Sequence, residues 1–67
     1  MTVKLSNIKF EDGMTLPCDL NLLIDDPAPG TIKVKEELDQ YVSDNAFTQL
    51  EYSFGQKAKS FTIESIS

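Results

Sequence analysis

The stretch from Met14 to Ile24 constrains the fold more than any other part of the chain, because apolar residues occupy every second position along it. Those even positions hold Met14, Leu16, Cys18, Leu20, Leu22 and Ile24. Strict alternation over this length is typical of a β-strand with one face against a core and the other near water. We therefore expect the core to be built on this strand, with Cys18 as a small buried hydrophobic residue.

A second strand is expected from Val3 to Phe10, joined to the first by a hairpin. Its apolar residues change parity at Ser6–Asn7, so a β-bulge there would bring all four of them to one face. A three-residue loop, Glu11–Gly13, with Gly13 in the left-handed region, would close the hairpin. The resulting pairs are Phe10 with Met14, Ile8 with Leu16, Leu5 with Cys18, and Val3 with Leu20.

After a proline-containing connector, the segment from Thr31 to Asn45 predicts a helix. A narrow apolar stripe recurs there at helical spacing, formed by Val34, Leu38, Tyr41 and Val42. Asn45 would end the helix as a left-handed cap, which would place Asp44 in the last turn, against the helix dipole. A competing interpretation makes Ile32 to Val34 a short strand and starts the helix later.

The remaining residues predict a second hairpin. Alternating apolar residues predict a strand from Ala46 to Phe54, and Phe61 and Ile63 begin the last strand, after a loop over Gly55–Ser60. The expected fold is therefore a single small α+β domain over residues 1–67, with the order ββαββ and one helix packed on a four-stranded sheet. The strand order would be β-grasp-like, with the first and last strands central and parallel, or all-antiparallel.

The residue types present exclude most enzyme chemistry. The chain has no histidine, which removes Cys–His and Ser–His nucleophiles and an ordinary zinc site. Carboxylates occur in pairs, but acid–base work needs a pocket that separates two pKa values, and a domain of one sheet and one helix rarely encloses one. The lone Cys18 has no partner for an internal disulfide. We expect no catalytic residues, no metal site and no cofactor, and hence a protein that is not an enzyme.

The charge balance points to a protein partner. Six lysines and no arginine stand against eleven carboxylates, which gives a net charge of −5. Direct binding to nucleic acid and to anionic membranes is therefore disfavoured. The chain contains no apolar run of membrane-spanning length and no secretory signal, so a cytoplasmic location is expected. A basic surface on another protein is the natural electrostatic complement.

These features favour a non-enzymatic interaction protein, a small acidic inhibitor or adaptor of the kind common among proteins of phages and other mobile elements. The expected contact surface is the outer side of the helix and the acidic residues before it: Asp25, Asp26, Glu36, Glu37, Gln40 and Asp44. The alternative is a structural subunit that forms homo-oligomers through a sheet edge or an exposed sheet face. Leu23, Phe47 and Ile66 fit no expected core row and would line such a surface.

Overall fold

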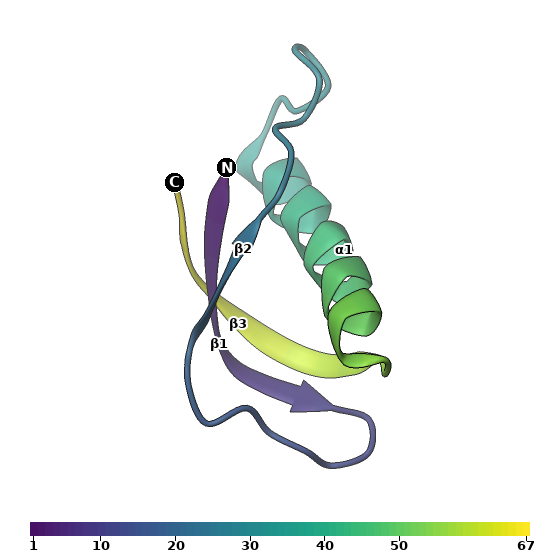
Figure 1. The fold of residues 1–67 in the computed structure, drawn as a ribbon. Coiled ribbons are helices and arrows are strands. Elements are labelled where there is room, and N and C mark those ends of the chain that lie inside the picture. Colours follow the sequence, from purple (N-terminus) through teal and green to yellow (C-terminus); the bar gives the residue numbers. More distant parts are fainter.

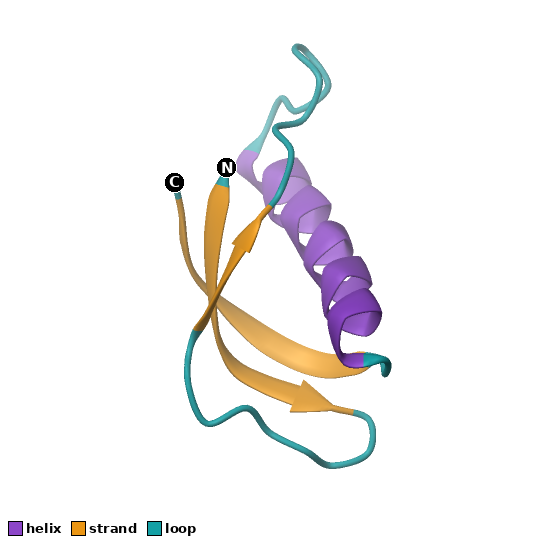
Figure 2. Ribbon diagram, viewed as in Figure 1, coloured by secondary structure: helices purple, strands orange, loops and turns teal.

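The fold combines one helix with one three-stranded sheet (Figure 1). The computed structural model describes residues 1–67, and its elements are β1 (Thr2–Phe10), β2 (Leu20–Leu23), α1 (Lys35–Phe54) and β3 (Ala58–Ile66). The sheet order is β2-β1-β3, and both strand pairs are antiparallel (Figure 2). The class is α+β, but the expected four-stranded ββαββ sheet is wrong. The β-grasp-like order is wrong as well, because the first and last strands are antiparallel neighbours.

Strand β1 is central, and it carries the expected bulge. Asn7 has a φ of 52°, and β1 has one more residue than β3 between the pairs Ser6–Thr62 and Lys9–Ser60. The extra residue shifts the alternation, so that four apolar side chains of β1 lie buried on one face: Val3, Leu5, Ile8 and Phe10. The bulge at Ser6–Asn7 is thus confirmed. Both β1 and β3 bend strongly along their length (Figure 1).

The first hairpin agrees with the expected pairing only next to its loop. Next to the loop, Phe10 N–H donates to Met14 C=O at 2.8 Å and Leu16 N–H donates to Ile8 C=O at 3.0 Å, as the three-residue loop requires. Beyond that point the expected pairs are wrong, since Leu5 faces Leu20 and Val3 faces Leu22.

The reason lies in the three residues Pro17–Asp19, which leave the ladder before β2 begins. Pro17 has no N–H to donate, so strand pairing is weakest there. Asp19 pairs with Lys4 at 3.5 Å, outside the sheet hydrogen bonds. The long strand expected from Met14 to Ile24 is therefore reduced to Leu20–Leu23 and an isolated bridge at Thr15, and Cys18 is exposed instead of buried.

The helix begins and ends later than expected. The residue before it, Val34, is extended and 51% exposed, so it is not part of the stripe, and Ile32–Val34 form no strand. At the other end, Gly55 has a φ of 73° and donates its N–H to the carbonyl of Glu51 at 2.9 Å. Gly55 is therefore the left-handed cap. Asn45 lies inside the helix, where its side chain donates to the carbonyl of Tyr41 at 2.8 Å, so the expected cap is wrong.

The segment Ala46–Phe54 is helical because its buried residues follow a period of four. Val42, Ala46 and Leu50 are fully buried on the same side of α1. Tyr52, which the strand interpretation placed on the same face as Leu50, is 92% exposed. The segment contains no glycine or proline that would stop a helix. The strand and the hairpin expected from this part of the chain are therefore wrong.

One core joins the helix to the sheet. Side chains of β1 form its centre, and Val42, Ala46 and Leu50 cover them from α1, with Ile24 and Ala58 also buried. Leu38 and Tyr41 of the expected stripe are partly buried beside this core. The loop from β2 to α1 projects from the body (Figure 1). Its base is held by the Tyr41 hydroxyl, which donates to the carbonyl of Asp25 at 2.7 Å.

Candidate protein-interaction surfaces

The solvent-facing side of α1 forms an acidic surface. Residues 37, 44 and 51 are seven apart, so they lie in one row along the helix, opposite the row formed by Val42, Ala46 and Leu50. All are exposed, as are their neighbours Glu36 and Gln40. We call this surface the acidic helix face, and its members are Glu36, Glu37, Gln40, Asp44 and Glu51. The Gln40 side chain donates to the Asp44 carboxylate at 2.7 Å.

No lysine interrupts the acidic helix face. The only lysine in α1 is Lys35, which lies in the first turn on the side toward β3 and pairs with Asp39 at 2.9 Å. That hydrogen bond and the negative charge of Asp39 raise the pKa of Lys35. The other lysines lie in the sheet or in loops, at positions 4, 9, 33, 57 and 59. Of the carboxylates on the acidic helix face, only Glu36 lies close enough to Lys35 to interact with its charge, and Glu37, Asp44 and Glu51 have no lysine beside them on α1.

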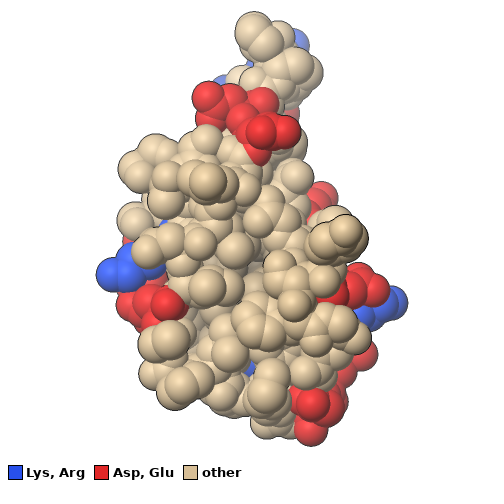
Figure 3. All heavy atoms as spheres, in the orientation of Figure 1, with Lys and Arg blue, Asp and Glu red and all other residues tan.

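The six expected contact residues are all exposed, but they differ in surroundings. Glu36 and Glu37 lie in the first turn of α1, where the helix dipole favours negative charge. Asp44 lies in the middle of the helix, so the expectation that it opposes the dipole from the last turn is wrong. Asp26 pairs with the chain amino terminus at 3.1 Å, and Asp25 is its exposed neighbour in the loop. In Figure 3, acidic side chains gather below the projecting loop.

Glu51 belongs to the acidic helix face, although the sequence reasoning does not include it. In the expected strand over residues 46–54, its side chain would not align with Glu37 and Asp44. The spacing of seven between Glu37, Asp44 and Glu51 is a helical signal that the apolar alternation of Leu50, Tyr52 and Phe54 obscures.

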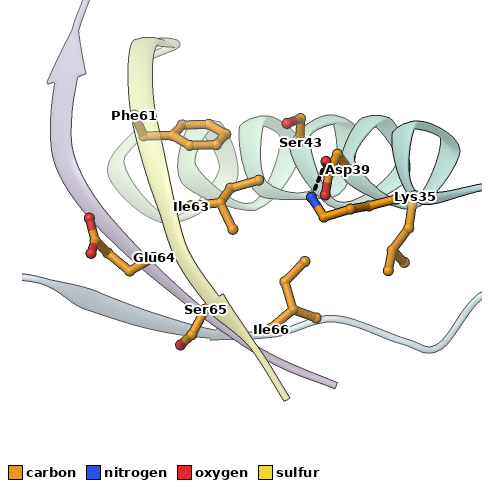
Figure 4. A pocket seen from close by; sticks show the side chains of 9 residues that line it. Lys35, Asp39, Ser43, Phe61, Ile63, Glu64, Ser65 and Ile66 are labelled. Carbon is orange, nitrogen blue, oxygen red and sulfur yellow. Dashed lines mark hydrogen bonds and ion pairs between the residues drawn. The ribbon is translucent and has the colours of Figure 1, made fainter.

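A second surface lies between α1 and the free edge of β3. A groove of about 590 Å³ runs along this edge (Figure 4). Ile63 and Ile66 project from β3 toward the helix, and the Lys35–Asp39 pair and Ser43 line the opposite wall. No strand pairs with β3 on this side, because β3 is last in the sheet order. The groove thus adjoins a strand of nine residues with one unpaired edge.

An aromatic pair extends this groove. Phe47 of α1 and Phe61 of β3 have ring centroids 4.5 Å apart, and Phe47 remains 38% exposed. Of the other residues expected at an oligomer surface, Ile66 lines the groove, whereas Leu23 lies in β2 and is 78% exposed. Phe47 and Ile66 are therefore brought to one side of the molecule, and Leu23 is on a different strand.

No three carboxylate or thiol side chains come close enough together to hold a metal ion. The only helix, α1, lacks the combination of length and apolar character that crossing a membrane requires. Comparisons with protein-family models, with curated proteins and with solved structures gave no match to this chain.

Proposed function

We propose that this protein is a non-enzymatic interaction module, an inhibitor or adaptor that binds a basic surface of a partner protein through the acidic helix face. The observation that carries the proposal is the exposed row of Glu37, Asp44 and Glu51, spaced seven residues apart with no lysine among them. Such a row complements lysine and arginine side chains and speeds association by electrostatic steering.

The rigidity of the helix supports this function. The row is carried by a helix of twenty residues whose opposite side is fixed in the core by Val42, Ala46 and Leu50. The backbone that carries the carboxylates is therefore fixed along about 20 Å of helix, at about 1.5 Å per residue. A preorganised surface of this kind loses less conformational entropy on binding than a flexible acidic tail.

The test compares two triple variants with the same change in net charge. In the first, Glu37→Gln, Asp44→Asn and Glu51→Gln neutralise the acidic helix face. In the control, Glu11→Gln, Asp12→Asn and Asp19→Asn neutralise three exposed carboxylates elsewhere. A partner is first captured from the source cell, and its affinity for each purified variant is then measured at several salt concentrations.

We expect the helix variant to bind about tenfold more weakly or worse, mainly through a slower association rate, and the control to bind about as tightly as the wild type. The wild-type affinity should also fall as salt rises. Equal loss in both variants would mean that net charge alone matters, and salt-independent binding would exclude the acidic helix face as the interface.

A second candidate function is that of a structural subunit that forms homo-oligomers. The observation that favours it is the unpaired edge of β3, beside a groove lined by Ile63 and Ile66. This surface borders the acidic helix face, because Phe47 lies seven residues after Gln40 in the same row of α1. The row of Glu37, Asp44 and Glu51 is not part of it.

A further inference from the structure

The backbone of β3 is open for pairing at the middle of the strand. Thr2 and Ser67 exchange both backbone hydrogen bonds, at 2.7 and 2.8 Å. Because hydrogen-bonding direction alternates along an antiparallel strand, Ser6 of β1 also directs its backbone groups toward β3, where it faces Thr62. The two neighbours of Thr62 on β3 then direct their N–H and C=O groups to the free edge, away from β1.

The side chains of β3 are arranged symmetrically about Thr62. In each direction from Thr62, the first and the fourth residues have buried or half-buried side chains, which we call covered. The other side chains of β3 are exposed. The covered residues are Ala58, Phe61, Ile63 and Ile66. The symmetry arises because β3 has one extra residue relative to β1 on each side of Thr62, around Lys59 and around Glu64. The strand thus presents the same pattern in both directions.

A strand with such a pattern can pair with a second copy of itself. In an antiparallel arrangement centred on Thr62, Phe61 faces Ile63 of the second copy, and Ala58 faces Ile66. Covered side chains then meet covered side chains, and exposed ones meet exposed ones. A shift by one residue would instead oppose Phe61 to Thr62 and break this match.

The charged side chains of β3 do not oppose this pairing. Glu64 accepts a hydrogen bond from the Ser6 hydroxyl of β1, and in this register it faces Ser60 of the second copy. Lys59 faces Ser65 of the second copy. No like charges therefore meet across the antiparallel pair.

The groove beside β3 fits the same occupant. Phe61 of the second copy, placed opposite Ile63, enters the groove between β3 and α1, and the small Ala58 comes beside Ile66. Phe47, whose ring packs at a tilt against Phe61, would lose its exposure to water. The same association thus buries the apolar surface of the groove and pairs the free backbone groups of β3.

We propose that two copies of this chain associate through antiparallel pairing of their β3 strands, centred on Thr62. The result is a continuous six-stranded sheet in the order β2-β1-β3-β3-β1-β2, with the two helices side by side on one face. The association deepens the second candidate function and rests on it, whereas it does not depend on binding of a basic partner by Glu37, Asp44 and Glu51.

The first test places charges at the two-fold axis. Thr62 is exposed and faces its own copy there, so Thr62→Lys alone, or Thr62→Glu alone, opposes two like charges and should weaken self-association about tenfold in sedimentation equilibrium. The two variants mixed in equal amounts should form a heterodimer tighter than either homodimer, because a lysine then faces a glutamate. Circular dichroism checks that each variant is folded.

The second test fixes the register without changing a charge. In a Cys18→Ser background, Thr62→Cys places two thiols opposite each other at the two-fold axis, within the Cα separation of a disulfide. Ser60→Cys is the matched control, because its two copies are offset by four residues, or roughly 13 Å. Mild oxidation with diamide should cross-link the Thr62→Cys protein efficiently and leave the Ser60→Cys protein as a single chain on a non-reducing gel.

A wild-type protein that sediments as a monomer at every concentration would overturn the proposal. Equal cross-linking at the two positions, or a dimer that both charged Thr62 variants leave unchanged, would also overturn it, since either result would place the contact elsewhere.

Discussion

Asn7 forms the bulge that brings the four apolar side chains of β1 to one face of the sheet. Its φ of 52° lies in the left-handed region, which asparagine tolerates better than most other side chains. The change of parity from Val3 and Leu5 to Ile8 and Phe10 was readable in the sequence, because a strand with both pairs buried needs one extra residue between them. The positive φ of Asn7 could not be predicted in this way, since a bulge also forms without one.

We expect Asn7→Val to lower the free energy of unfolding by about 1–2 kcal/mol, since a β-branched side chain clashes with the backbone at positive φ. Asn7→Gly should remain within about 0.5 kcal/mol of the wild type, because glycine adopts this conformation without strain. Urea unfolding followed by circular dichroism measures both. A valine variant as stable as the glycine variant would show that Asn7 does not hold this conformation in solution.

Cys18 shows where residue-scale reasoning failed. Its place in the alternating row indicated burial, yet the departure of Pro17–Asp19 from the ladder leaves it exposed. We therefore expect a thiol reagent such as Ellman's reagent to label native Cys18 as fast as it labels the urea-unfolded protein, within a few-fold. Cys18→Ser should abolish labelling and change stability by less than about 0.5 kcal/mol, as for other surface substitutions. Protection of the thiol until the protein unfolds would contradict the structure here.

At the scale of elements, the sequence determined the helix less well than the first strand. The stripe of Leu38, Tyr41 and Val42 located the helix, but the alternation of Leu50, Tyr52 and Phe54 resembled a strand. Both periods fit a short apolar segment, and what decides between them is the packing of Ala46 and Leu50 on the sheet, a tertiary contact. The end of the helix at Gly55 was readable in principle, because glycine is the commonest left-handed cap.

The cap gives a test of the helix boundary. Gly55→Ala should lower the free energy of unfolding by about 1 kcal/mol, because alanine pays a steric cost at a φ of 73° while the added methyl group meets no other atom. Thr48→Ala, inside the helix on its exposed side, should instead stabilise the protein slightly through higher helix propensity. If residues 46–54 formed a strand, Thr48→Ala would be neutral or destabilising, since threonine favours strands.

At the scale of the molecule, the pairing of strands was the feature that the sequence did not determine. β1 was expected to form a hairpin with its neighbour in the chain and, in the β-grasp-like order, to run parallel to the last strand. It pairs with β2 over only four residues and runs antiparallel to β3, almost the whole chain length away. Alternation specifies which face of a strand is buried but not which strand lies beside it. The acidic character and the lack of histidine were evident from composition. Four of the six expected contact residues lie on α1 even though its boundaries moved, and Asp25 and Asp26 lie in the loop before it.

The hydrogen bonds between Thr2 and Ser67 also determine how the protein responds to tension. A force that pulls these two residues apart acts across the β1–β3 ladder, along its hydrogen bonds, because both residues lie at the same end of the sheet. The bonds are then loaded one pair after another, as in opening a zipper, instead of sharing the load as they do when strands are sheared along their length. The domain would consequently yield at low force and extend as β3 separates from β1.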